Sequence, residues 1–95
     1  MDKSIHHREN RSRGLFYIEE NEHKITEITY NITHSNLIVI DHSETKMGYE
    51  NQGYASELLD YVVNWARENQ IKIEPLCPFA EIKFDENPEY ADVRA

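Results

Sequence analysis

The sequence has 95 residues and a formal net charge of −8, with 18 acidic and 10 basic side chains. A chain of this length is expected to form one domain over residues 1–95, because it is too short for a second hydrophobic core. Residues 1–14 hold four basic and two acidic side chains, and the rest hold six and sixteen, a charge of −10. This balance argues against nucleic-acid binding, which depends on a basic surface, and is compatible with a cationic substrate such as an amine.

Cysteine usage and hydropathy indicate the compartment. Cys77 is the single cysteine, so the chain has no internal disulfide. No apolar run approaches the ~18 residues that a membrane-spanning helix needs, and the first residues lack the apolar segment of a signal peptide. We therefore expect a cytoplasmic protein without membrane contact.

Three β-strands are predicted in the first half of the chain. The run Leu15–Ile18 is dense in β-forming residues, and Glu19–Glu22 supplies a turn. Residues 24–32 alternate between apolar and polar side chains, which is typical of a half-buried strand. Leu37–Ile40 is apolar on both faces, as expected of a central strand. Short turns predict a three-stranded antiparallel meander, while the polar residues 1–13 are expected to fray or to form a short edge strand.

An amphipathic helix follows, and it is predicted to begin between Asn51 and Tyr54. Its apolar stripe, which should lie on the sheet, contains Ala55, Leu59, Val62, Val63 and Ala66. Asn69 suits a left-handed C-cap, after which residues 71–77 form another strand. A strand, a helix and a strand in succession make a crossover in which the two strands run parallel. The fold class is therefore α/β (α+β), with this parallel strand as the fourth of the sheet.

The last part of the chain is predicted to leave the sheet and form a short helix. Pro75 and Pro78 flank Cys77 and remove two backbone donors, so the parallel strand should splay from its neighbour there. Residues 79–84 suit the short C-terminal helix. Two apolar residues of the following tail are expected to hold it to the core, namely Tyr90 and Val93.

The start of the long helix is a candidate anion site. The preceding loop ends in Gly53, and the first N–H groups of a helix lack helical acceptors and lie at the positive end of the helix dipole. Such an end often binds phosphate. The alternative is a plain strand-to-helix turn in which the glycine has no further role.

Three side chains are expected to converge on this site. His42 and Glu44 project from the end of the central strand on one face, and Cys77 ends its parallel neighbour. Ligands of open parallel sheets bind at the carboxyl ends of the strands, so these groups should share one crevice. An imidazole and a sulfur on opposite sides of the sheet would contradict this arrangement. The alternative is a buried, inert Cys77 and a surface His42. No ligand spacing of a known metal site is present, so no metal is expected.

Several short motifs resemble a known family. The segment 50–55 (Glu-Asn-Gln-Gly-Tyr-Ala), set between a strand and a helix, resembles motif A of the GNAT superfamily of acetyl-CoA-dependent N-acetyltransferases, whose loop reads Gln/Arg-x-x-Gly-x-Gly/Ala. More narrowly, residues 40–43 (Ile-Asp-His-Ser), 66–69 (Ala-Arg-Glu-Asn) and 75–79 (Pro-Leu-Cys-Pro-Phe) resemble a subfamily of very short GNAT-like proteins. The resemblance covers roughly residues 15–93.

The resemblance implies acetyl-CoA as the cofactor, with its diphosphate on the amides near Gly53 and its pantetheine arm between the splayed strands. Glu50 departs from the motif, because a carboxylate cannot donate to a diphosphate, so that contact falls to backbone amides. The cofactor-binding residues are then expected to be Lys46, Gln52, Gly53, Tyr54, Ala55, Ser56 and Phe79. A histidine and a cysteine matching His42 and Cys77 are the functional pair of the subfamily. The acceptor is not implied, because the subfamily lacks the helices that form its pocket in larger relatives.

The chemistry expected of these residues is acyl transfer to an amine. His42 could accept the amine proton, with Glu44 as a competing base. Cys77 could protonate the leaving thiolate, or carry the acetyl group as a covalent intermediate; we rank direct transfer above the covalent route. The sequence thus predicts a small N-acetyltransferase, monomeric or weakly dimeric. Its acceptor is an unidentified amine, and the acidic charge of the chain is compatible with a cationic one. The alternative function is a non-catalytic CoA-binding or protein-interaction module.

Overall fold

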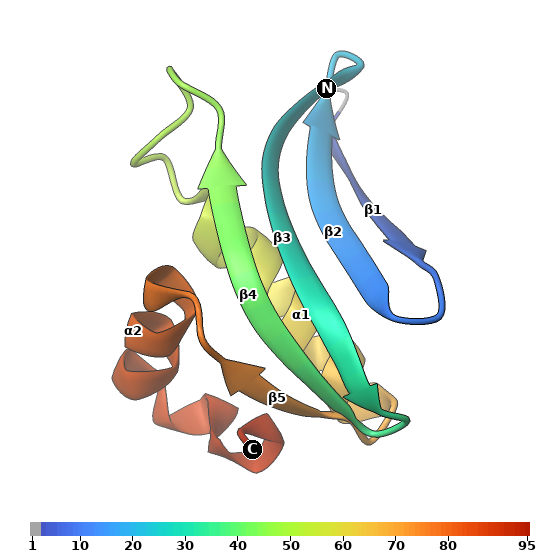
Figure 1. The fold of residues 1–95 in the computed structure, drawn as a ribbon. Helices are drawn as coiled ribbons and strands as arrows, with labels where there is room; N and C mark the ends of the chain where they lie inside the picture. The colour runs from blue at the N-terminus through green and yellow to red at the C-terminus, as the bar shows by residue number, and fades with distance from the viewer. Residues whose placement is uncertain (1–2) are drawn as a thin grey trace.

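The computed structural model of the protein describes residues 3–95 and contains a five-stranded sheet in the order β1-β2-β3-β4-β5 (Figure 1). The pairs β1–β2, β2–β3 and β3–β4 are antiparallel, whereas β5 runs parallel to β4. The strands are β1 (Lys3–Glu9), β2 (Arg13–Glu20), β3 (His23–His34), β4 (Leu37–Thr45) and β5 (Lys72–Pro75). The helices are α1 (Tyr54–Glu68), α2 (Pro78–Glu86) and the 3-10 helix η1 (Pro88–Val93).

The predicted architecture is confirmed, with one more strand than the three-stranded meander. Of the two alternatives for the first residues, the structure has the edge strand, so the parallel strand is fifth rather than fourth. This polar strand is held by every second side chain: Ile5 pairs with Ile18, and His7 stacks on Phe16 with 3.9 Å between ring centroids. The strand therefore gains apolar contacts that its composition does not reveal.

The hydrophobic core lies between the sheet and α1, which covers one face of the strands (Figure 1). The helix contributes Leu58, Leu59, Val62, Val63 and Ala66. The strands contribute buried residues that alternate along them, among them Phe16, Ile18, Ile28, Tyr30, Ile38 and Ile40. The tail is held as predicted, because Tyr90 and Val93 are 7% and 2% exposed. In the view of Figure 1, no helix formed by residues 3–95 lies on the face of β1–β4 away from α1; we call this the open face.

Strand β4 continues beyond the point where its parallel partner stops. The β4–β5 pairing runs from Leu37–Lys72 to Ile40–Pro75, and the amides of Leu76 and Cys77 then both donate to the Ile40 carbonyl. The chain turns away into α2 at this point, whereas β4 extends to Thr45 (Figure 1). The two strands therefore separate, as the prolines predicted. The parallel strand ends at Pro75, two residues before its predicted end at Cys77.

Gly14 gives the first testable consequence of the packing. The Tyr30 ring crosses β2 at this glycine and its hydroxyl donates to Glu9 on β1, so a Cβ at position 14 would clash with the ring carbon Cζ. We expect Gly14→Ala to lower the free energy of unfolding by about 1–3 kcal/mol or more, through overpacking. Urea denaturation measures it. Gly48→Ala is the control, since that site has open space and only backbone strain; equal effects of the two would contradict the packing argument.

Candidate active site

Strand β4 contains a β-bulge at Asp41. Ile40 pairs with Tyr30 and His42 pairs with Thr29, so Asp41 has no β3 partner of its own. An extra residue in one strand shifts the alternation of side chains by one position. Asp41 and His42 consequently both face the open side of the sheet, although they are consecutive in sequence.

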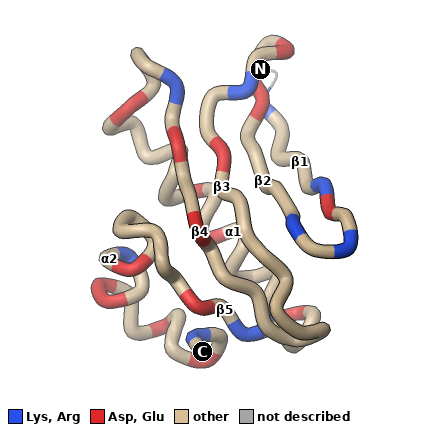
Figure 2. Tube along the Cα trace, in the orientation of Figure 1, with Lys and Arg blue, Asp and Glu red and all other residues tan. Residues whose placement is uncertain are grey.

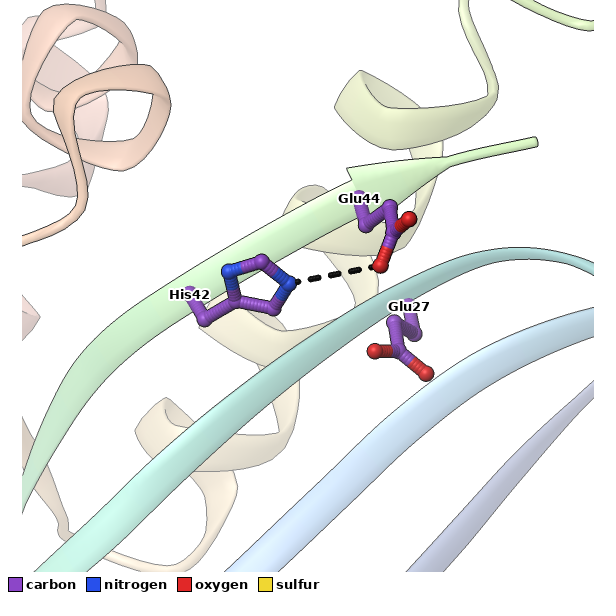
Figure 3. Close-up of side chains that lie close together, drawn as sticks. All are labelled: Glu27, His42 and Glu44. Carbon is purple, nitrogen blue, oxygen red and sulfur yellow. Dashed lines mark ion pairs between the residues drawn. The ribbon is translucent and has the colours of Figure 1, made fainter. Parts of the chain in front are cut away.

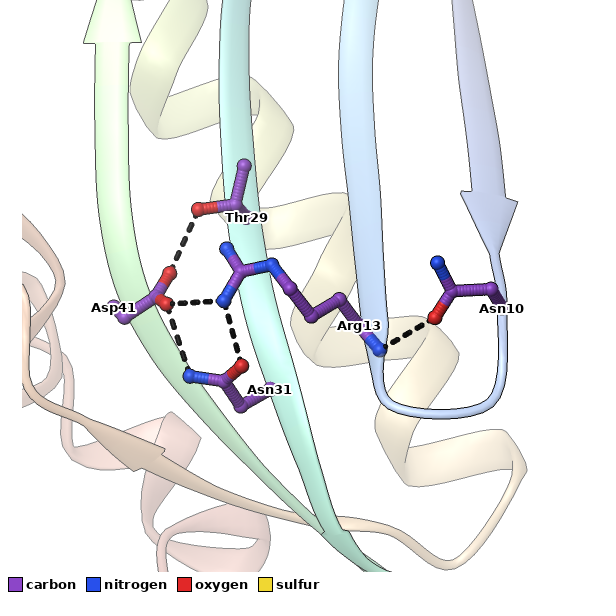
Figure 4. A network of polar contacts seen from close by, with 5 residues as sticks. All are labelled: Asn10, Arg13, Thr29, Asn31 and Asp41. Carbon is purple, nitrogen blue, oxygen red and sulfur yellow. Dashed lines mark hydrogen bonds and ion pairs between the residues drawn. The ribbon is translucent and has the colours of Figure 1, made fainter.

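A polar network holds the bulge in place on the open face (Figure 4). The Asp41 carboxylate accepts hydrogen bonds from Thr29 Oγ1 at 2.7 Å, Asn31 Nδ2 at 3.0 Å and Arg13 Nη1 at 3.0 Å. Arg13 reaches across from β2 and also donates to Asn31 Oδ1 at 2.6 Å, while its own amide donates to Asn10 Oδ1. The extra residue of β4 is thereby tied to two neighbouring strands.

The same network makes the stability of the protein depend on pH. Burial raises the pKa of Asp41, but hydrogen bonds from Thr29 and Arg13 and the charge of Arg13 outweigh it and hold the pKa below its ordinary value. A depressed carboxyl pKa stabilises the fold above the unfolded pKa of about 3.9, and this contribution is lost as the pH falls through the lower folded value.

We therefore expect Asp41→Asn to cost about 1–2 kcal/mol of unfolding free energy at pH 7, because the carboxylate's charge-assisted bonds are lost at a partly exposed site. The difference from the unmodified protein should shrink as the pH is lowered below 4. Denaturant unfolding at several pH values measures both effects. A difference that stays constant down to pH 2 would show that the charge of Asp41 has no part in it.

Beyond the bulge, His42 and Glu44 point to the open face beside Glu27 of β3 (Figure 3). His42 Nε2 lies 3.5 Å from Glu44 Oε1, and both side chains are more than half exposed. Glu27 pairs directly with Glu44, and Lys24 Nζ lies 2.7 Å from the Glu27 carboxylate. Like charges that face each other across strands repel, so a further cation beside Glu44 is favoured. Ligand atoms of Glu27, His42 and Glu44 lie within 4.8 Å of one another, the spacing of a cation site.

Cys77 lies on the other side of β4. Its Sγ is 3.3 Å from Ser43 Oγ, and Ser43 pairs with the fully buried Ile28 on the face that α1 covers. The thiol is 5% exposed and belongs to the core cluster. The expectation that His42 and Cys77 share one crevice is therefore wrong. The bulge is the reason, because it turns His42 to the open face and the next residue, Ser43, toward the sulfur.

A cavity of about 500 Å³ opens beside the start of α1, the end of β4 and α2. Five of the expected cofactor-binding residues line it, namely Gly53, Tyr54, Ala55, Ser56 and Phe79. Lys46 and Gln52 do not: the Lys46 side chain lines a separate cavity with Glu27 and Glu44, and Gln52 Nε2 donates to the Gly48 carbonyl. Both residues lie on the loop before Gly53, whose residues Tyr49, Glu50 and Asn51 line the cavity instead.

The wall of this cavity at α1 has the character of an anion site. Gly53 adopts a left-handed conformation with φ of 87°, and no side chain caps the helix. The first backbone bond runs from the Glu57 amide to the Gly53 carbonyl, so the amides of Tyr54, Ala55 and Ser56 have no helical acceptor. These amides and the positive end of the dipole favour a bound anion.

Two charged residues of the cavity act in opposite directions. Glu50 lines it, as the departure from the motif suggested, and its carboxylate opposes an anion. Lys83 of α2 also lines it and supplies a cation that the sequence analysis missed. The sequence spacing could have identified Lys83, because it lies four residues after Phe79 and residues four apart share one face of a helix.

The family model of the GCN5-related N-acetyl-transferases matches residues 15–93. No curated protein matches the sequence. The solved structure of a GCN5-like protein from Staphylococcus aureus is 34% identical, covering 97% of this chain and 87% of that one with a TM-score of 0.74. A ribosomal-protein-alanine N-acetyltransferase from Brucella melitensis is 16% identical, with a TM-score of 0.64 over 90% of this chain and 64% of that chain.

The N-acetylglutamate synthase of Neisseria gonorrhoeae, solved with coenzyme A, also shares the fold: it is 16% identical with a TM-score of 0.61 over 76% of this chain. This chain spans 18% of that protein. The family model and the shared fold thus define a protein of the N-acetyltransferase class. The chain belongs to the GCN5-related N-acetyltransferase family, because the family model covers most of its length. Among the described residues 3–95, no helix is long and apolar enough to cross a membrane.

Proposed function

We propose that the protein transfers the acetyl group of acetyl-CoA to an amine. The observation that carries the proposal is the cavity at the start of α1, where three unpaired amides and Lys83 offer donors for a diphosphate. The split between β4 and β5 opens beside this cavity and gives an extended pantetheine arm backbone groups of β4 to bind. The fold shared with a CoA-bound N-acetylglutamate synthase supports the same donor.

The reaction forms a C–N bond and breaks the C–S bond of the thioester, so it needs a base for the ammonium proton and a donor for the leaving thiolate. We assign the base to His42, the imidazole on the open face. Glu44, at 3.5 Å, stabilises the imidazolium that results and can itself accept the proton. The acceptor amine therefore approaches from the open face.

We assign Cys77 to the thiolate that leaves rather than to the amine that attacks. Its thiol and the Ser43 hydroxyl are 3.3 Å apart on the α1 side of β4, two residues before the cavity residue Phe79. This position suits a proton donor to the leaving thiolate or a wall of the cofactor channel. An acetyl-cysteine route would have to carry the acetyl group from the α1 side to the amine on the open side, so the arrangement favours direct transfer.

Calorimetric titration with acetyl-CoA, followed by mass spectrometry of a broad amine panel, tests the proposal. We expect saturable binding and amine acetylation that depends on the protein. Absence of binding at millimolar acetyl-CoA would overturn the whole assignment. Binding without acetylation of any amine would favour a CoA-binding module without catalysis.

Lys83 provides a further prediction. Because its ammonium is a cation lining the cavity, we expect Lys83→Ala to weaken CoA binding about tenfold, the loss of one charge-assisted contact. Calorimetry measures the dissociation constant. Lys72→Ala is the matched control, since that ammonium donates to the Asp92 carbonyl outside the cavity. The contact would be refuted if the two variants bound CoA equally well.

A further inference from the structure

A straight row of side chains crosses four strands on the open face. Arg8 of β1 pairs with Leu15, Leu15 pairs with Thr29, and Thr29 pairs with His42 of β4. Paired residues of antiparallel strands project to the same side of a sheet. The proposed base and an arginine therefore stand at the two ends of one row, with an apolar residue and a hydroxyl between them.

A second cavity, of about 360 Å³, lies along this row. It is lined by residues of β1, β2, β3 and the β1–β2 turn: Arg8, Glu9, Asn10, Arg13, Gly14, Leu15 and Thr29. Thr29 connects the cavity to His42, because it lines the former and pairs with the latter. The cavity is thus directly beside the proposed base, on the face from which the acceptor approaches.

Of the charged residues in this cavity, Arg8 is free to bind a ligand. Glu9 accepts a hydrogen bond from the Tyr30 hydroxyl, and the Arg13 guanidinium is held by Asp41 and Asn31. Over residues 3–95, no side-chain hydrogen bond or ion pair engages Arg8, whose guanidinium stands 6.0 Å from the Tyr17 ring centroid. A guanidinium that lies in a cavity with its N–H donors unpaired is a binding group for carboxylates, which it contacts with two parallel hydrogen bonds.

The open face is therefore divided by charge. Basic residues gather at the hairpin that joins β1 and β2, and acidic residues lie along β4 (Figure 2). The row beside that of His42 ends in the facing pair Glu27 and Glu44. Lys24 already pairs with Glu27, so Glu44 is the carboxylate that favours an ammonium group. Strands are about 4.8 Å apart, so β4 and β1 are separated by roughly 14 Å at the backbone, and side chains leaning inward shorten the gap.

We propose that the acceptor is an aminocarboxylate, an amine that also carries an anionic group of the carboxylate type. Its ammonium binds beside Glu44 and His42, and its carboxylate binds Arg8 in the cavity at the other end of the row. The assignment deepens the proposed function and rests on it. The assignment also explains why a chain of acidic composition has a cation, Arg8, in its acceptor site.

A matched pair of acceptors tests this subsite: 6-aminohexanoate carries a carboxylate, and hexylamine does not. We expect the unmodified protein to acetylate 6-aminohexanoate with a kcat/KM at least about tenfold higher, as one charge-assisted contact provides. Arg8→Ala should abolish that preference without changing kcat/KM for hexylamine. Arg11→Ala, in the exposed turn outside the cavity, should retain it. A preference that is absent from the unmodified protein, or that survives in Arg8→Ala, overturns the proposal.

A binding measurement separates this proposal from the proposed function. Hexanoate has the carboxylate but no amine to acetylate, so its binding does not depend on turnover. In NMR titrations we expect hexanoate to shift the amides of Arg8, Leu15 and Thr29 in the unmodified protein and not in Arg8→Ala. Unshifted amides overturn the carboxylate subsite even if amines are acetylated. Shifted amides without any acetylation overturn the acetyltransferase assignment, and the acceptor with it, but leave the carboxylate site.

Discussion

Ser56→Asp is expected to lower CoA affinity on the order of 100-fold while leaving the fold at least as stable. Ser56 lies in the first turn of α1 and lines the cavity. A carboxylate there interacts favourably with the helix dipole, worth about 0.3–1 kcal/mol. The same carboxylate repels a diphosphate on the neighbouring amides, by about 3 kcal/mol for one charge pair at roughly 5 Å and an effective dielectric constant of 20.

The prediction is specific because the affinity for CoA should fall while the stability of the fold should not. Calorimetry gives the affinity, and thermal unfolding gives the stability. Ser56→Ala is the control, because it removes the hydroxyl without adding charge and should bind CoA nearly as well as the unmodified protein. If Ser56→Asp bound CoA with undiminished affinity, the diphosphate could not lie at the start of α1.

His42→Ala is expected to lower kcat/KM for amine acetylation by about 10²–10⁴, the contribution of a general base. The affinity for acetyl-CoA should be unchanged, because His42 faces the open side and does not line the cavity at α1. Acetylation rates and calorimetry on the same preparation measure the two quantities. His34→Ala, an exposed histidine at the end of β3, is the matched control.

Cys77 distinguishes direct transfer from a covalent route in the same experiment. Direct transfer predicts that Cys77→Ala retains amine acetylation at a reduced rate and that no acetyl-enzyme accumulates when the amine is omitted. A protein that gains one acetyl group on Cys77 and passes it to amines would contradict the assignment of the proton donor. Undiminished acetylation by His42→Ala would contradict the assignment of the base.

The elements of the fold followed from sequence patterns because each depends on local periodicity. The alternation in residues 24–32 and the apolar stripe of the helix both survive as buried faces. The sequence does not decide whether the first residues form the short polar edge strand β1, since its stability comes from stacking of His7 on Phe16 rather than from its composition. The strand limits near Pro75 were also displaced, because backbone bonding to the Ile40 carbonyl decides where the chain turns.

The site was predictable in part for a related reason. The cavity wall formed by Gly53 and the residues after it could be predicted, because the boundary between a loop and a helix leaves a local signal in the sequence. The bulge at Asp41 is a register shift between two strands and leaves no mark in the spacing of β4 itself. One undetected extra residue was enough to place His42 and Cys77 on the same face in the sequence-based arrangement and on opposite faces in the structure. The row from Arg8 to His42 likewise exists only once four strands are in register.

The central claim is that the diphosphate binds at the start of α1 and the pantetheine arm follows β4 past the end of β5. NMR titration of the isotope-labelled protein with CoA tests it most directly. We predict that the largest amide shifts fall on residues 54–56 and on β4 from Asp41 to Thr45. Large shifts confined to other elements, with the start of α1 unchanged at saturation, would contradict the claim.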